Sequence, residues 1–310
     1  MTEASIPARS PQTLTAGRAA LLLAVAVFFF GLSWPIMKIA VHAITPLWFS
    51  VLRMAAASAV FAAILAERGK LIWPLRQDVP MVLGLGLLQF GVMSCMVAYG
   101  VANVGAGRSA ILIYTNSIWV TTGAMLFLGE RINRWQLVGM ACGLMGLVML
   151  FSPLDLDWSN RHMLTGNGLI VGGSMIWSIA LVQVRGHRWH ADPLQLMPLQ
   201  TLLGSLFSLP FAIALEGPLP RIGWSWSGAA AFVAVVLMAT CFGFWGLVMA
   251  GRRLPAIAVS LGQMATPVIG VASSAALVAE IPSHADIAGL GLILAGVAIA
   301  AILGRRRAPA

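Results

Sequence analysis

Apolar segments long enough to cross a membrane recur along almost the whole chain, and this limits the possible folds more than any single motif does. A transmembrane helix needs about 20 mostly apolar residues to span roughly 30 Å of hydrocarbon, where backbone groups find no water. Short links join the apolar segments, so we predict an all-α polytopic membrane protein without a soluble domain. Ten segments meet the requirement, at about 19–40, 46–66, 79–101, 107–128, 133–151, 166–185, 193–214, 227–249, 255–279 and 285–303.

Composition and charge agree with a membrane protein. Only 9% of the residues are charged, and the mean hydropathy is +0.90. The net charge of +9 is spread over loops, so membrane topology explains it better than a nucleic-acid partner does. With the N-terminus inside, most of the 19 Lys and Arg residues fall on the cytoplasmic side. We therefore predict a multi-pass inner-membrane protein with both termini in the cytoplasm.

The first 18 residues are polar, and we interpret 1–18 as a disordered cytoplasmic tail and 304–310 as a basic one. A cleaved signal peptide is the alternative for the N-terminus. The first apolar run is longer than a typical signal-peptide core and lacks a clear A-x-A cleavage site.

The two halves of the chain share a pattern. "FLGERINRWQLVGM" (127–140) resembles "LVAEIPSHADIAGL" (277–290), so that Glu130 aligns with Glu280 and Gly139 with Gly289. We predict one repeat at 19–151 and a second at 166–303, joined by the loop 152–165. Each repeat holds five helices, so the second must enter the membrane inverted. Inverted repeats allow a central site to open alternately to either side, which favours transport.

Four motifs carry a resemblance to a known family. They are "FFGLSWPIMK" ending at Lys38, "PLWFSVLR" from Pro46 to Arg53, "LFLGER" with Glu130, and "ATPVIGVASSAALVAE" with Pro267 and Glu280. In this order, over about residues 19 to 303, the chain resembles the drug/metabolite transporter superfamily, in its ten-helix form with two EamA domains. The resemblance implies a bacterial-type exporter of amino acids or related metabolites. Phe30, Ser117 and Ala279 depart from the pattern, and the missing fourth-helix proline puts equal bending of the two halves in doubt.

Neutral polar and aromatic side chains within the helices are the candidate substrate-binding residues. Several share helical faces, and the repeat brings the fourth-helix stripe onto the ninth helix. Interfacial aromatic belts are the alternative for the tryptophans. The candidates are Trp34, Gln89, Tyr99, Asn103, Tyr114, Ser117, Trp119, Trp177, Trp245, Ser260 and Gln263.

Charged and kink-forming residues are assigned gating or structural roles: Lys38, Arg53, Glu130, Pro267 and Glu280. Each glutamate is expected to accept hydrogen bonds at a helix end, and direct contact with the substrate is the alternative. Arg53 lies inside the second helix, where it either snorkels or bonds helix-end carbonyls, or attracts an anionic substrate group.

The sequence places all its acids and histidines in tails, loops or helix ends. Proton-coupled pumps commonly use a titratable group at the membrane midplane. We therefore predict a facilitated-diffusion uniporter with alternating access. A nucleotide-sugar or lipid-linked-sugar carrier and a proton-coupled drug exporter are the alternatives.

Catalytic and metal-binding patterns are missing from the sequence. It contains no H-E-x-x-H, no paired membrane aspartates, and no metal-ligand spacing around Cys95, Cys142 and Cys241. We predict a protein that is not an enzyme and has no metal or cofactor. Its partners are a small-molecule substrate and the lipid bilayer. Small-residue faces at Gly139 and Gly143, and at Gly291 and Ala295, suit packing within the chain or a homodimer.

Overall fold

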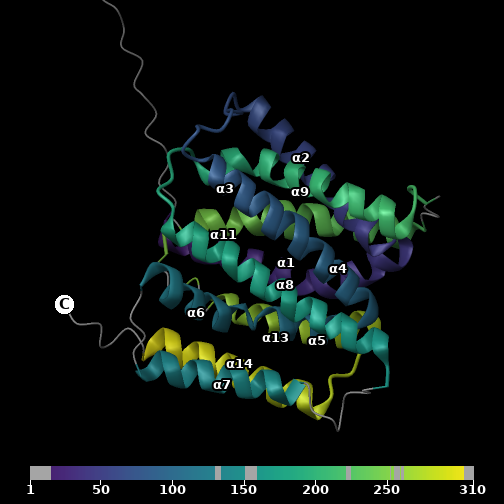
Figure 1. Ribbon diagram of the computed structural model, residues 1–310, viewed down its shortest axis with the longest axis vertical. Helices are drawn as coiled ribbons and strands as arrows, with labels where there is room; N and C mark the ends of the chain where they lie inside the picture. Colours follow the sequence, from purple (N-terminus) through teal and green to yellow (C-terminus); the bar gives the residue numbers. More distant parts are fainter. Residues whose placement is uncertain are drawn as a thin grey trace, which may run out of the picture.

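Helices make up all the regular structure in the described part of the chain. The computed structural model describes residues 15–129, 134–150, 159–220, 225–251, 253–254, 259 and 262–303. Figure 1 shows the helices lying side by side in one bundle, with α7 and α14 together along one flank. The elements are α1 (Ala16–Ala43), α2 (Pro46–Glu67), α3 (Val79–Gly84), η1 (Leu85–Met93), α4 (Ser94–Asn103), α5 (Ala106–Ile113), α6 (Asn116–Leu128), α7 (Arg134–Leu150), α8 (Arg161–Gly186), α9 (Pro193–Glu216), α10 (Trp226–Ala234), η2 (Val235–Gly243), α11 (Phe244–Gly251), α13 (Ala265–Val278) and α14 (His284–Ile302).

Seven stretches of described helix are long and apolar enough to cross a membrane: Ala16–Ala43, Pro46–Glu67, Val79–Asn103, Ala106–Phe127, Arg161–Val184, Pro193–Glu216 and Trp226–Gly251. Three more helices are apolar but shorter, at Arg134–Leu150, Ala265–Val278 and His284–Ala300. Each lies within, or within a residue of, a predicted span. Part of the predicted span 255–279 lies outside the described residues.

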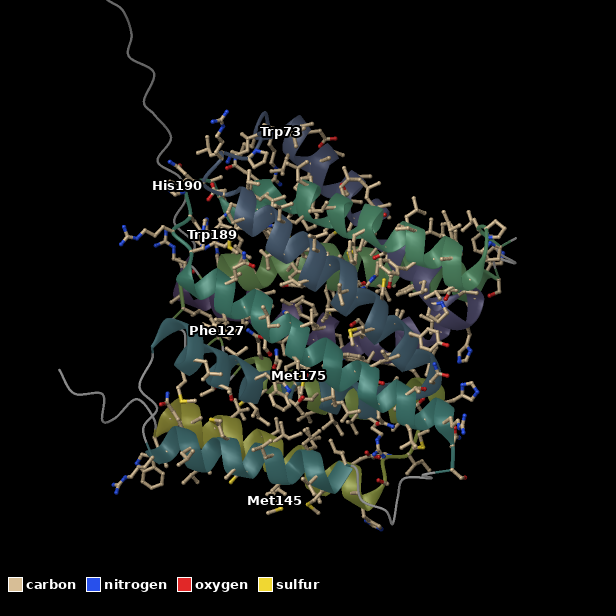
Figure 2. The ribbon with its side chains drawn as sticks, in the orientation of Figure 1. Trp73, Phe127, Met145, Met175, Trp189 and His190 are labelled. Atoms are coloured by element: carbon tan, nitrogen blue, oxygen red, sulfur yellow. The ribbon has the colours of Figure 1, made fainter. Side chains whose placement is uncertain are left out.

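Large apolar side chains cover the flanks of the bundle. Phe127 is 77% exposed and Met145 is 58% exposed, and both are seen with Met175 among the side chains in Figure 2. In water this surface would be costly, whereas lipid tails solvate it well. The exposed apolar flanks therefore agree with a protein embedded in a bilayer.

Two segments of π-helix interrupt the third and eighth predicted spans. The segment η1 runs from Leu85 to Met93, and η2 runs from Val235 to Gly243. The two π segments occupy the same positions in the two halves when the sequences are aligned with Glu130 on Glu280. A π turn bonds each residue to the fifth one along, which rotates later side chains relative to α-helical spacing, and such turns often occur at functional sites.

The fourth predicted span is broken even though it has no proline at Ser117. A turn at Tyr114 and Thr115 separates α5 from α6. The Thr115 Oγ1 donates to Leu112 O at 2.7 Å and lies 3.0 Å from Ser174 Oγ, so side-chain hydrogen bonds hold the turn. Met264, the equivalent of Tyr114 in the second half, also lies in a turn, just before α13.

Connections gather at two opposite ends of the bundle. We call the end with residues 43–46, 103–106, 216–220, 225–226 and 278–284 the Lys38 end, and the end with residues 67–79 and 186–193 the Asp78 end (Figure 1). At the Lys38 end, the Glu216 carboxylate accepts hydrogen bonds from the backbone amides of Leu47 and Trp48, at 2.9 and 3.1 Å. It thereby caps the start of α2, which packs along α9.

Candidate functional site

A cavity lies in the middle of the bundle, with walls from both halves of the chain. Within it, a volume of about 120 Å³ is open to the centres of water-sized molecules. Both π segments contribute to its wall, so the irregular parts of the third and eighth spans face the empty space. The lining residues are Phe30, Ser33, Trp34, Met37, Arg53, Met54, Gln89, Phe90, Met93, Ser94, Val97, Ile113, Tyr114, Trp177, Val235, Ala239, Thr240, Phe244, Leu247, Gln263 and Thr266.

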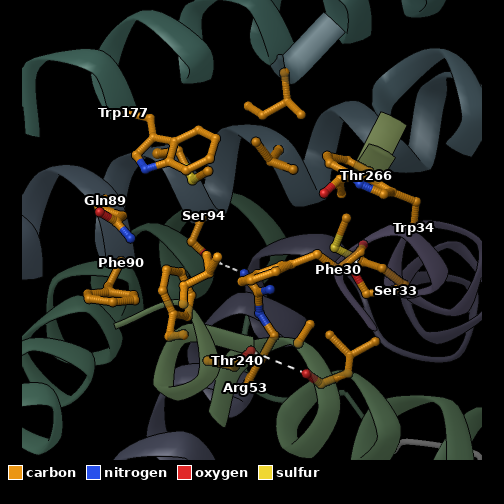
Figure 3. A pocket seen from close by; sticks show the side chains of 18 of the residues that line it. Phe30, Ser33, Trp34, Arg53, Gln89, Phe90, Ser94, Trp177, Thr240 and Thr266 are labelled. Atoms are coloured by element: carbon orange, nitrogen blue, oxygen red, sulfur yellow. Dashed lines mark hydrogen bonds between the residues drawn. The ribbon is translucent and has the colours of Figure 1, made fainter. Parts of the chain in front are cut away.

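Arg53 carries the only charge among these lining residues, all of which belong to the described chain. Its Nη2 donates to the Ser94 Oγ at 2.6 Å, and its Cζ lies 5.3 Å from the ring centroid of Phe49. Figure 3 shows the guanidinium reaching into the cavity beside Ser94. Its Nε is buried and has no hydrogen-bond partner. Arg53 therefore presents a positive charge with an unused donor.

The rest of the wall is mainly aromatic and aliphatic. Trp34 and Trp177 face the cavity from α1 and α8, and Phe30 and Phe90 lie nearby (Figure 3). The indole Nε1 of Trp177 is buried without a hydrogen-bond partner, so it is a second unused donor. Such a wall suits a ligand with an apolar body and at least one hydrogen-bond acceptor.

Five of the predicted binding residues line this cavity, and the fold brings them together from distant parts of the sequence. Arg53, for which contact with an anionic substrate was one of the predicted roles, lines it with them. Pro267, predicted to have a gating or structural role, is buried in α13 next to the lining residue Thr266. The five binding residues are Trp34, Gln89, Tyr114, Trp177 and Gln263.

Four other predicted binding residues are not among the residues that line the cavity: Tyr99, Asn103, Trp119 and Trp245. Tyr99 is 41% exposed, and its carbonyl accepts a hydrogen bond from the Asn103 side chain at 2.7 Å. The prediction assumed α-helical spacing from Gln89 onward, but η1 rotates the residues after it, so Ser94 and Val97 line the cavity instead.

The Trp245 ring contacts the Phe242 ring, with centroids 5.5 Å apart.

The remaining predicted residues are an ion pair and three positions with little or no described structure. Lys38 and Glu280 bind each other at the Lys38 end. Glu130 and Ser260 lie outside the described residues, and Ser117 is described in its backbone only.

Sequence reasoning missed several residues that matter to the cavity. Ser94 holds the Arg53 guanidinium, and Thr240 lines the wall from η2, where its Oγ1 donates to Val235 O at 3.3 Å. A helical wheel assumes α-helical spacing and does not account for a π turn, so neither position was predicted. Phe30 also lines the cavity, and its departure from the family motif was noted without predicting that role.

Both halves of the chain match the model of one known protein family. The model of the EamA-like transporter family covers residues 17–152 and 164–302. The chain belongs to the EamA-like transporter family. It is therefore a membrane transporter, and the two matched segments are two copies of the same family domain.

Curated relatives of this EamA-like transporter are similar over most of its length. An uncharacterized transporter of Bacillus subtilis (strain 168), YoaV, is 28% identical over 78% of this chain and 82% of its own. A probable amino-acid metabolite efflux pump of Salmonella typhimurium is 26% identical over 90% of this chain and 93% of its own. A solved crystal structure matches with a TM-score of 0.64 over 94% of this chain and 98% of the other, at 21% identity. That likeness concerns the fold alone.

Proposed function

We propose that this transporter exports small metabolites that combine a carboxylate with an apolar body, in particular amino acids with apolar or aromatic side chains. The observation that carries the proposal is the charge of the cavity, where Arg53 is the only charged residue among the described lining residues. The similarity to a probable amino-acid metabolite efflux pump supports the same class.

The carboxylate of the substrate completes the hydrogen bonding of Arg53. Burying a cation without a counter-ion is costly, and no carboxylate of the described chain pairs with this guanidinium. An incoming carboxylate accepts from the guanidinium and neutralises the charge, because charge-assisted hydrogen bonds of this kind are strong. The Ser94 hydroxyl keeps the guanidinium in place before the substrate arrives.

The apolar body of the substrate packs against the aromatic wall. Trp34, Trp177 and Phe244 offer flat surfaces that tolerate side chains of different shape. The described lining of the cavity includes no acid to pair with an ammonium group, so the carboxylate, and not the amino group, dominates recognition.

The proposed mechanism is alternating access between two five-helix halves in inverted orientation, ten helices in total. Three observations support it: the family model matches twice, the π segments η1 and η2 occupy equivalent positions in the halves, and turns interrupt the chain at the equivalent residues Tyr114 and Met264. Broken helices around a midplane site are typical of such transporters.

We further propose that the Asp78 end and both termini face the cytoplasm. Arg68, Lys70 and Arg76 lie in the connection 67–79 at that end, as the positive-inside rule requires. At the opposite end, Lys38 pairs with Glu280 and Arg108 with Asp286, so both cations have local partners.

Transport in this proposal is facilitated diffusion. The described cavity lining contains no carboxylate and no histidine that could exchange a proton against substrate. The driving force is therefore the gradient of the substrate itself.

Counterflow in proteoliposomes tests the proposal. Labelled phenylalanine, leucine, a hexose and an organic cation are each offered to vesicles loaded with the unlabelled compound, with and without a pH gradient. We expect exchange of the amino acids at a rate that the gradient does not change. Uphill uptake driven by the pH gradient would contradict uniport, and exchange of only the hexose or only the cation would contradict the substrate class.

A further inference from the structure

Three polar side chains meet at the Asp78 end of the bundle, away from the central cavity. Asp78 precedes α3, and His187 and His190 lie in the connection between α8 and α9. The His187 Nε2 is 2.9 Å from the Asp78 Oδ1, and the His190 Nδ1 is 3.4 Å from the same oxygen. One potential ligand atom from each of the three residues lies within 4.8 Å of the other two.

The two separations from the Asp78 Oδ1 are compatible with a single metal ion. With metal–ligand bonds of about 2.0–2.1 Å, atoms 2.9 Å apart subtend about 90° at the ion, and atoms 3.4 Å apart subtend about 110°. Both angles occur in zinc-type coordination. The ion would replace the imidazole protons that now point at the carboxylate.

Backbone amides already hold the carboxylate in position. The amide of Ala191 donates to the Asp78 Oδ2 at 2.8 Å, and that of His190 donates to the Oδ1 at 3.2 Å. These two bonds orient the carboxylate, as the partners around a metal ligand do.

We propose that Asp78, His187 and His190 form a binding site for one divalent transition-metal ion of the zinc class. Two imidazole nitrogens and one carboxylate oxygen suit zinc better than magnesium or calcium, which prefer oxygen ligands. The carboxylate is fully buried, whereas the His190 side chain is 41% exposed. The ion thus enters from the His190 side, which is visible at the surface in Figure 2, and a water completes its coordination.

The ion would join two connections that are far apart in the sequence. Residues 67–78 lead into α3, and residues 187–192 lead into α9, so a bound metal links the two halves at this end. The Gln195 side chain, in the first turn of α9, also donates to Lys70 O at 3.0 Å, which holds the connection 67–78 to the start of α9 without a metal. The metal strengthens an existing contact, and the fold does not depend on it.

Cobalt titration of the tag-free protein in detergent tests the site, because tetrahedral Co²⁺ absorbs visible light strongly. We expect one Co²⁺ per chain, displaced by Zn²⁺. His187→Gln and His190→Gln should each weaken binding by about tenfold or more. The matched control is His162→Gln, in the first turn of α8 and outside the cluster, which should bind as the wild type does.

A second readout guards against misfolded variants. Zn²⁺ should raise the melting temperature of the wild type and of His162→Gln but not that of His190→Gln, because a ligand stabilises only the state that binds it. The His190 side chain is 41% exposed, so its variant is expected to fold. The proposal is overturned if the wild type binds no stoichiometric metal, or if both cluster variants bind Co²⁺ as tightly as the wild type.

Discussion

The Nζ of Lys38 lies 2.6 Å from the Oε1 of Glu280, and this ion pair ties α1 to the segment that follows α13. The Oε2 of Glu280 also accepts a hydrogen bond from the Gly107 amide, in the first turn of α5, at 3.2 Å. Lys38 in turn donates to Val104 O at 3.1 Å. One ion pair therefore holds three helical segments together at the Lys38 end.

Breaking this ion pair should destabilise the protein, and the two partners should be coupled. Both side chains are about a fifth exposed, at 21% and 23%, so we expect a coupling free energy of about 1 kcal/mol. Thermal unfolding in detergent of Lys38→Met, Glu280→Gln and the double variant measures it. Losses that simply add in the double variant would show that the pair contributes nothing.

Ala279 adopts a left-handed backbone conformation, with φ of 53°, as the C-cap of α13. A Cβ in this conformation costs about 1 kcal/mol or more, and glycine avoids the cost. Ala279→Gly should therefore raise the free energy of unfolding by about 1 kcal/mol. The matched variant is Gly129→Ala, at the equivalent position with φ of +65°, which should lower it. An unchanged melting temperature in both variants would refute the argument.

Gly139 allows α7 and α14 to approach closely. A Cβ added there would lie 2.4 Å from the Gly296 carbonyl oxygen, whereas one at Gly291 would meet nothing within 4 Å. We predict that Gly139→Ala lowers the melting temperature, because the backbones must separate. Gly291→Ala should keep or raise it, since alanine favours helix over glycine by about 1 kcal/mol. Equal effects of the two substitutions would contradict this packing.

The sequence indicated the helices well because spans of apolar residues follow directly from the thickness of a bilayer. It predicted that Glu280 would accept hydrogen bonds at a helix end, and the structure shows such a bond from Gly107. It also suggested packing at Gly291, but the contacts of α14 with α7 occur at Gly289 and Gly296. The periodicity of apolar residues cannot show which face of a helix packs against its neighbour when every face is apolar.

The candidate site was less predictable, for two physical reasons. A π turn has no sequence signature. The prediction therefore placed Tyr99 on the same face as Gln89 by assuming α-helical spacing through η1. The cluster of Asp78, His187 and His190 joins loops that are distant in the sequence, and no spacing rule for metal ligands brings them together. Both features depend on tertiary structure.

Arg53 should determine substrate affinity if it binds the carboxylate. Arg53→Gln removes a charged hydrogen-bond donor, which is worth about 1.5–3 kcal/mol, so the KM for apolar amino acids should rise about tenfold or more. Trp177→Phe, which removes the unused Nε1, should have a smaller effect in the same direction. Trp245→Phe, outside the cavity, serves as the control for both. Counterflow kinetics measure these values, and an unchanged KM in Arg53→Gln would contradict the role of Arg53.

Competition against phenylalanine counterflow tests most directly whether the cavity selects a carboxylate. Three compounds share one aromatic body: phenylalanine is a zwitterion, 3-phenylpropionate keeps only the carboxylate, and phenylalaninamide keeps only the amine. With Arg53 as the only charge among the described lining residues, phenylalanine and 3-phenylpropionate should compete and phenylalaninamide should not. Competition by phenylalaninamide equal to that of phenylalanine, with none by 3-phenylpropionate, would contradict the account.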